Sequence, residues 1–171
     1  MQTAKMKPRV GISSCLMGEA VRFNGGHQKD NFVVDVLAKH VELVPICPEV
    51  EAGMGVPRPA IRMVRQESGI GLFESATGTD HSETMNTTLT SISSRLKGCD
   101  LDGFLLKRAS PTCGVSGVKI YANSDKKSQV VGRGRGFFAD RLTTDFETLA
   151  LSEEGWLNDA MLRQQFLHRI F

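Results

Sequence analysis

The stretch FLLKRASPTCG, residues 104–114, combines a short apolar strand with a tight turn that ends in a cysteine. The pair Ser110-Pro111 is typical of a turn, because the proline ring fixes the backbone and the serine hydroxyl caps it. Two earlier stretches, RVGISSC (9–15) and VELVPIC (41–47), also run from an apolar segment into a cysteine. The sequence therefore predicts three buried strands with a cysteine just beyond the carboxyl end of each.

Helical patterns separate these strands. Residues 31–41 and 80–98 place apolar side chains at helical spacing, and Asp80 with Glu83 resembles a capping box at the start of the second helix. One apolar stripe of that helix consists of Met85, Leu89, Ile92 and Leu96. Strands alternating with helices are typical of an α/β domain with a largely parallel sheet. We expect residues 1–171 to form one such domain.

The remaining segments predict further strands and two further helices. Residues 61–66 and 71–75 are expected to form two strands or a hairpin, and residues 118–125 are expected to form a hairpin with 126–130. A Gly-rich turn, GRGRG (132–136), is expected to open a helix over 137–149. The C-terminal segment 157–171 reads as an amphipathic helix with Asn158 as its cap.

The composition excludes several classes of protein. With 40% hydrophobic and 23% charged residues among 171, the chain has the profile of a globular domain. A net charge of +2 is too small to indicate nucleic-acid binding by itself. No apolar run approaches the roughly 20 residues of a membrane span, and the N-terminus shows no apolar signal region. We therefore expect a cytoplasmic protein that does not contact membranes.

The four cysteines fall into two groups. Cys99 continues the apolar stripe of the helix before it and is expected to pack as an inert side chain. Cys15, Cys47 and Cys113 follow strands, and ligands of parallel sheets bind beyond the carboxyl ends of strands. Because no CxxC pair occurs, any metal site must be assembled from these separate positions.

Two interpretations of this cysteine trio stay open from the residues alone: simple packing, and ligation of a metal. Thiolates favour zinc or an iron–sulfur cluster. A structural zinc normally takes a fourth protein ligand, for which His27 is the candidate nearest to a strand end. Three thiolates without a fourth ligand instead suit a cubane cluster that leaves one iron open as a Lewis acid.

Polar residues beside the trio are candidates for catalysis and substrate binding. Glu49, two residues after Cys47, could exchange protons, and Ser110 could face the same pocket. Phosphate-binding candidates are the arginines of the Gly-rich turn, the arginines near the Gly-Pro loop, and a lysine next to Ser110. These are Arg133, Arg135, Arg58, Arg62 and Lys107.

The blocks VGISSCLMGEAVRFNGGH, PICPEVEAGMGVPRP and LLKRASPTCGV resemble the signature segments of the iron–sulfur-dependent thiouracil desulfidases, a family first catalogued as a domain of unknown function. The resemblance extends through GRGRGFFADRL and SEEGWLNDAMLRQQFLHRIF, so it covers nearly the whole chain. Three separate cysteine motifs in the same order make it specific.

The resemblance implies a Rossmann-like fold and a 4Fe–4S cluster held by Cys15, Cys47 and Cys113, with the fourth iron free of protein ligands. It also implies that Glu49 and Ser110 assist the chemistry, and that Cys99 is not a ligand. The implied activity is the non-redox desulfuration of 2- or 4-thiouracil, or of 4-thiouridine monophosphate, to the oxo form and hydrosulfide.

The chain departs from the family at one pocket position, because Asn24 stands where many relatives carry an aspartate. This change is expected to affect the choice of substrate rather than the cluster. Alternatives remain: a desulfidase acting on 4-thiouridine in tRNA, a sulfur-inserting relative, a tRNA-binding domain and a non-catalytic zinc module. A small thiopyrimidine or its nucleotide is favoured over tRNA.

Overall fold

The three predicted strands that precede Cys15, Cys47 and Cys113 lie side by side in one parallel sheet. The computed structural model describes residues 7–171. The prediction that the N-terminus carries no secretory signal falls partly on residues 1–6, which lie outside the described residues. The sheet has the order β2-β1-β5-β8, and every neighbouring pair is parallel. Its strands are β1 (Arg9–Ser13), β2 (Glu42–Ile46), β5 (Gly103–Leu106) and β8 (Ala150–Glu153).

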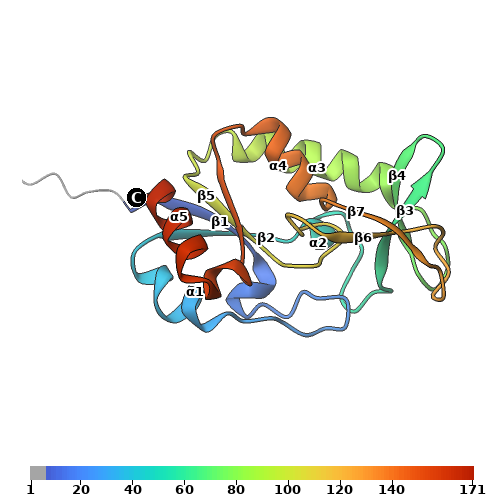
Figure 1. The fold of residues 1–171 in the computed structure, drawn as a ribbon, viewed down its shortest axis with the longest axis horizontal. Helices are drawn as coiled ribbons and strands as arrows, with labels where there is room; N and C mark the ends of the chain where they lie inside the picture. The colour runs from blue at the N-terminus through green and yellow to red at the C-terminus, as the bar shows by residue number, and fades with distance from the viewer. Residues whose placement is uncertain (1–6) are drawn as a thin grey trace, which may run out of the picture.

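Helices cover both faces of this sheet, as Figure 1 shows. On one face α1 (Asn31–Asp35) and α5 (Ala160–Ile170) pack against a core that includes Val10 and Ile12. On the other face α3 (Ser82–Leu96) and α4 (Phe137–Asp145) pack against Phe104 and Leu106. Burying both faces of a parallel sheet in this way is the usual arrangement of α/β domains, and it confirms the predicted fold class.

A glycine in β1 lets the sheet and α4 come together. The ring of Phe104 packs edge-to-face on Phe138 of α4, with centroids 5.2 Å apart. A Cβ atom added at Gly11 would lie 2.2 Å from the Phe104 ring, closer than any carbon contact allows. Glycine is therefore the residue that fits at this position of β1.

A second sheet follows the first and contains two hairpins: the predicted pairing of 61–66 with 71–75 is present, whereas residues 118–121 pair with 130–134 rather than with the predicted segment 126–130. Its order is β4-β3-β6-β7, with a parallel β3–β6 pair between two antiparallel hairpins. It occupies the right-hand part of Figure 1. Its strands are β3 (Ile61–Gln66), β4 (Gly69–Glu74), β6 (Val118–Tyr121) and β7 (Val130–Gly134).

The Gly-rich stretch 132–136 differs from the prediction. It is expected to open a helix as a phosphate-binding turn, yet Gly132, Arg133 and Gly134 belong to strand β7. The cause is pairing with β6, where Arg133 lies opposite Lys119. Helix α4 begins at Phe137, with Gly136 as its N-cap.

Two helix starts also differ by one or two residues. Helix α3 begins at Ser82, and Asp80 accepts a hydrogen bond from the Ser82 backbone N–H at 2.8 Å, so Asp80 closes a turn and forms no capping box with Glu83. Helix α5 is capped by Asp159 rather than Asn158, because the Asp159 carboxylate accepts from two backbone N–H groups of the first turn.

The short helices complete the set of elements. They are η1 (Ser14–Met17), η2 (Leu37–Lys39), α2 (Pro48–Glu51) and η3 (Trp156–Asn158). Two of them, η1 and α2, follow β1 and β2 directly and so carry the residues just beyond those strands. Within residues 7–171, no helix has the length and apolar character to cross a membrane.

Candidate metal centre

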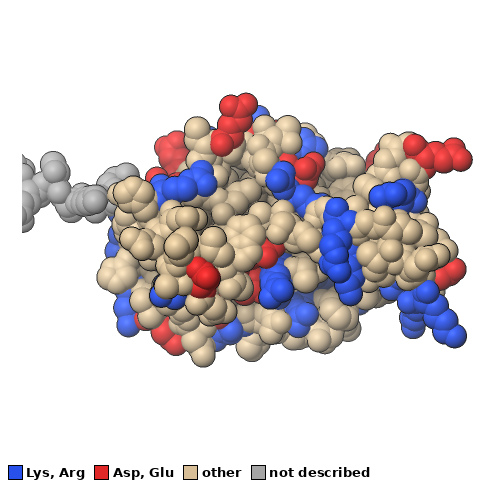
Figure 2. Space-filling view, viewed as in Figure 1, with Lys and Arg blue, Asp and Glu red and all other residues tan. Residues whose placement is uncertain are grey.

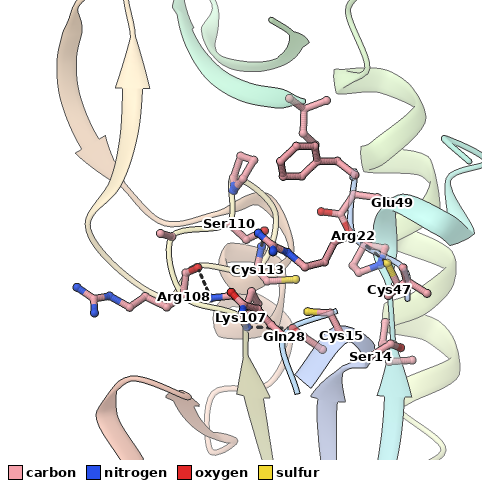
Figure 3. A pocket seen from close by; sticks show the side chains of 18 of the residues that line it. Ser14, Cys15, Arg22, Gln28, Cys47, Glu49, Lys107, Arg108, Ser110 and Cys113 are labelled. Carbon is pink, nitrogen blue, oxygen red and sulfur yellow. Dashed lines mark hydrogen bonds between the residues drawn. The ribbon is translucent and has the colours of Figure 1, made fainter. Parts of the chain in front are cut away.

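The three strand-end cysteines converge on one cavity. Cys15 lies in η1 after β1, Cys47 is the N-cap of α2 after β2, and Cys113 lies in the loop after β5. Because β1 lies between β2 and β5, these segments leave the sheet at neighbouring positions. All three cysteines line a cavity of about 400 Å³, and Figure 3 shows their sulfur atoms approaching the same space from three segments.

Burial keeps these thiols protonated in the absence of a cation. All are free cysteines. Burial raises the pKa of Cys15 to about 11 and that of Cys47 to about 12. The pKa of Cys113 lies well above its usual value, chiefly through burial and then through the nearby Glu49 carboxylate. A bound metal supplies the positive charge that such thiols need to become thiolates.

The donor set fits a metal cluster better than a single ion. Across residues 7–171, no group of three or more His, Cys, Asp or Glu side chains is arranged to hold one metal ion. His27, the candidate fourth zinc ligand, is exposed and does not line the cavity; its Nδ1 accepts from the Lys29 backbone N–H at 3.1 Å. Three sulfurs around an open cavity suit a group wider than one ion.

Glu49 lies against the cysteines. It belongs to the first turn of α2, is 8% exposed and lines the cavity. The Cys47 thiol donates to Glu49 Oε2 at 3.5 Å. The Glu49 carboxylate thus lies in the same enclosed space as the three sulfur atoms. There it can accept a proton from a molecule bound in the cavity.

Ser110 also lines the cavity, and its hydroxyl stabilises the loop of Cys113. Ser110 Oγ accepts hydrogen bonds from the backbone N–H groups of Thr112 at 3.2 Å and Cys113 at 3.0 Å. Because the oxygen is occupied as an acceptor, the hydroxyl proton is the part of this group that can interact with a ligand.

The start of α4 holds the same loop from the other side. The Phe137 N–H donates to Pro111 O at 3.1 Å, and the Phe138 N–H donates to Thr112 O at 2.8 Å. A Cβ atom at Gly136 would lie 2.6 Å from the Thr112 carbonyl. The close approach of α4 to the Cys113 loop therefore depends on glycine at residue 136.

Two predicted cationic residues line the cavity, but their charged groups are already engaged. Lys107 Nζ forms an ion pair with Glu154 and donates to Arg108 O. The Arg58 guanidinium donates to the carbonyls of Val21 and Gly55, both at 2.9 Å. Both side chains therefore brace the walls of the cavity.

The other predicted binding residues lie outside this cavity. Asn24 Oδ1 accepts from the Gly26 N–H at 3.0 Å in an exposed turn. Arg62 and Arg133 line a second, neighbouring cavity. Arg135 follows β7, and its Nε donates to Val115 O at 3.3 Å. The structure therefore does not gather the predicted phosphate-binding residues at one place.

Sequence reasoning missed two arginines of the cysteine cavity, Arg22 and Arg108. Figure 3 shows Arg22 reaching from the side of Glu49 toward Ser110. Among the described residues, neither guanidinium has a side-chain hydrogen bond or an ion pair. The signal for Arg22 was its place just before the Gly-rich loop that follows Cys15, and Arg108 directly follows the predicted Lys107.

Fold and site together define an α/β protein with a three-cysteine centre at the carboxyl edge of its parallel sheet. The sequence model of the 2-thiouracil desulfurase family matches residues 10–154. The chain belongs to this 2-thiouracil desulfurase family, as the sequence motifs predict.

Two relatives extend the comparison. The solved structure of the 4Fe-4S-dependent thiouracil desulfidase TudS matches with a TM-score of 0.70 and 25% identity, covering 93% of this chain and 99% of that one. The Bacillus subtilis (strain 168) protein YbbK, described as uncharacterized, is 27% identical over 128 residues, or 72% of this chain and 83% of its own length.

Proposed function

We propose that this protein is a 4Fe–4S-dependent desulfidase that converts a thiolated pyrimidine to its oxo form and hydrosulfide. The observation that carries the proposal is the convergence of Cys15, Cys47 and Cys113 on one cavity together with Glu49. Membership of the 2-thiouracil desulfurase family and the likeness to a 4Fe-4S-dependent relative support the same chemistry.

The cysteine trio would hold the cluster. Thiolate sulfur is the usual protein ligand of iron–sulfur clusters, and three cysteines leave one of four irons without a protein ligand. When bound, such a cluster supplies a Lewis-acidic iron for the sulfur of a thiocarbonyl. Cys99 takes no part, because it does not line the cavity and its thiol donates to Arg95 O instead.

Glu49 would act as the proton acceptor of the reaction. Desulfuration adds water to the thiocarbonyl carbon, forms a carbon–oxygen bond and breaks the carbon–sulfur bond, with no change in the number of electrons. The carboxylate of Glu49 takes the proton of the attacking water, and the sulfur leaves as hydrosulfide. The enclosed position of Glu49 in the cavity supports this role.

Ser110 and Arg22 would orient the pyrimidine. The Ser110 oxygen already accepts two backbone N–H groups, so this hydroxyl donates to a ring oxygen or nitrogen. Arg22 lines the same cavity with a guanidinium that can bind a ring carbonyl or stabilise negative charge that develops on the ring.

Anaerobic reconstitution with iron and sulfide, followed by a desulfuration assay, tests this proposal. We expect about four irons per chain and loss of the thiocarbonyl absorbance of 4-thiouracil and of its monophosphate. Cys113→Ala should abolish both cluster and turnover, whereas Cys99→Ala is the matched control and should keep both. A protein that takes up zinc but no iron, or that turns over equally well without Cys113, contradicts the proposal.

A further inference from the structure

A second cavity, of about 820 Å³, adjoins the cysteine cavity. The turn of Arg108, Ala109 and Pro111 lines both cavities, as do Ala60 and Ile61. A group bound at this boundary can therefore contact both spaces. The volume of the second cavity lies within the range of roughly 300–1,000 Å³ that is common for small-molecule and cofactor sites.

Positive charge predominates in the second cavity. Four cationic side chains line it, and Figure 2 shows Lys and Arg gathered over the β6–β7 part of this face. Its one acidic lining residue, Glu153, is buried and uses Oε1 to accept from the backbone N–H groups of Val115 and Ser116. The four cations are Arg62, Arg108, Lys119 and Arg133.

Two of these cations are fixed by the protein and two are available. The Arg62 guanidinium donates to Ser75 Oγ at 2.9 Å and to Asp125 O at 2.6 Å, and Arg133 donates to Gly117 O at 2.9 Å. In the part of the chain that the structure describes, the charged groups of Arg108 and Lys119 have no hydrogen bond to a side chain and no ion pair. The cavity thus contains two arginines that are held by hydrogen bonds within the protein, and two further cationic groups that can donate hydrogen bonds to a ligand.

The chain's only tryptophan and its only tyrosine both line this cavity. The Arg62 guanidinium stacks on the ring of Tyr121, 4.3 Å from its centroid. Trp156 lies in η3, which follows the first sheet, and Tyr121 lies in β6 of the second sheet. Aromatic rings interleaved with arginine and lysine are the arrangement by which proteins hold the bases and the phosphates of single strands.

We propose that the second cavity binds the nucleotide next to the thiolated one, so that the substrate is an oligonucleotide strand. The thiolated base enters the cysteine cavity, its phosphodiester lies at Arg108 on the boundary, and the neighbouring base stacks in the second cavity. A single phosphate would use neither the aromatic residues nor most of this volume. The inference rests on the proposed function only for the base placed beside the cysteines.

Binding of unmodified nucleotides to the cluster-loaded protein tests the inference without any turnover. Isothermal titration calorimetry compares uridine, UMP and the dinucleotide pUpU, none of which carries a thiocarbonyl. Because stacking of one base is worth about fivefold to a hundredfold in affinity, pUpU should bind at least about fivefold more tightly than UMP. Equal affinities for pUpU and UMP overturn the inference, whatever the result of the desulfuration assay.

The single tryptophan provides a second readout on the unmutated protein. Stacking of the neighbouring base on Trp156 should quench its fluorescence when pUpU is added, whereas UMP should leave it nearly unchanged. Quenching of the same size by both nucleotides, or by neither, contradicts the placement of the second base.

A matched pair of variants locates the phosphodiester. Arg108→Ala should weaken pUpU binding by about fivefold or more and reduce the dependence of that affinity on salt, because one phosphate contact is lost. Arg65→Ala removes the same charge from an exposed position of β3 that lines neither cavity, and it should change the affinity by less than about twofold. Equal losses in the two variants would overturn the assignment of Arg108.

Discussion

The carboxylate of Glu49 and the sulfur of Cys47 lie two residues apart in the chain, in contact at the edge of one cavity. Replacing Glu49 by Gln keeps the size of the side chain in the first turn of α2 and removes its negative charge. The amide cannot take a proton from water, so Glu49→Gln should lower turnover of 4-thiouracil by about 10²–10⁴-fold. The visible absorption of the cluster should remain, and stopped-flow assays with matched iron content measure the difference.

Glu51 offers the control for this substitution. It belongs to the same short helix, but its carboxylate pairs with Arg95 at 2.8 Å and does not line the cavity. Glu51→Gln should keep turnover within about twofold of the native protein. Normal turnover in Glu49→Gln would show that another group accepts the proton.

The backbone of Ala109, at the boundary of the two cavities, is strained. Its φ is 57°, in the left-handed region, which costs an L-residue roughly 1–2 kcal/mol. Glycine removes this cost but adds about 0.4–1 kcal/mol of unfolded-state entropy. Ala109→Gly should therefore raise the free energy of unfolding by about 0.5–1 kcal/mol in urea titrations. An unchanged or lower value would show that the turn is not strained.

The cysteine trio and Glu49 could be predicted because each follows an apolar strand, and chain order then fixes the edge of the sheet where they meet. The roles of the lysine and arginine side chains around the cavity could not be predicted from the sequence. Lys107 and Arg58 do line the cavity, but their bonds to Glu154 and to backbone carbonyls come from distant segments. Arg22 stands beside the Gly-rich loop after Cys15, but only the folded loop shows that its side chain lines the cavity.

Among the elements, α4 has the most direct effect on the site, because its first N–H groups bind the carbonyls of the Cys113 loop. Gly136→Ala would place a Cβ 2.6 Å from the Thr112 carbonyl, and backbone cannot move aside easily. We expect a loss of about 1–3 kcal/mol in the free energy of unfolding. Iron content after reconstitution should fall as well, because the loop shifts Cys113.

Gly132→Ala is the matched control within the same Gly-rich stretch. There the nearest atom to an added Cβ is the guanidinium end of Arg65, at 2.9 Å, and this flexible side chain can move. Its iron content should equal that of the native protein. Similar losses in both variants would mean that the glycines matter for the strand and not for the contact between α4 and the loop.

The strands that bear cysteines could be predicted from their apolar runs, whereas β8 could not. Two of its four residues, Ser152 and Glu153, are polar and yet buried, because Glu153 caps the backbone of residues 115–116. The prediction that residues 132–136 form a helix-opening turn was wrong for a related reason. Residues 132–134 form a strand because they pair with β6, and pairing with a separate segment leaves no signal in the local sequence.

In the whole molecule, a cluster would join three loops that leave the sheet from β1, β2 and β5. A group that binds the folded chain but not the unfolded chain stabilises the folded state by mass action. The iron also supplies the positive charge that compensates the buried thiolates. Removing the iron with a chelator under anaerobic conditions should therefore lower the Tm by about 5 °C or more. Differential scanning calorimetry measures the shift.

Cys113→Ala protein serves as the reference for this melting experiment. Its Tm should not respond to the chelator, since one ligand of the cluster is missing, and Cys99→Ala protein should respond like the native chain. A native Tm that is the same with and without iron would show that the cluster does not connect the three loops.

The α/β class and the alternation of helices and strands could be predicted for the whole molecule from periodicity. The second sheet illustrates the limit. Its hairpins are local and were predicted, the second with its return strand too early in the chain, but the parallel pairing of β3 with β6 joins residues far apart in sequence. That pairing creates the cationic cavity beside the cysteines, so the cavity is visible only in the fold.

Mössbauer spectroscopy of protein reconstituted with ⁵⁷Fe, before and after the addition of 4-thiouracil, tests the central claim most directly. Three cysteine ligands and one open iron predict a four-iron cluster in which one iron differs from the other three and alone changes its signal on addition of the substrate. Four equivalent irons that ignore the substrate, or a chain that takes up no iron, would contradict the account.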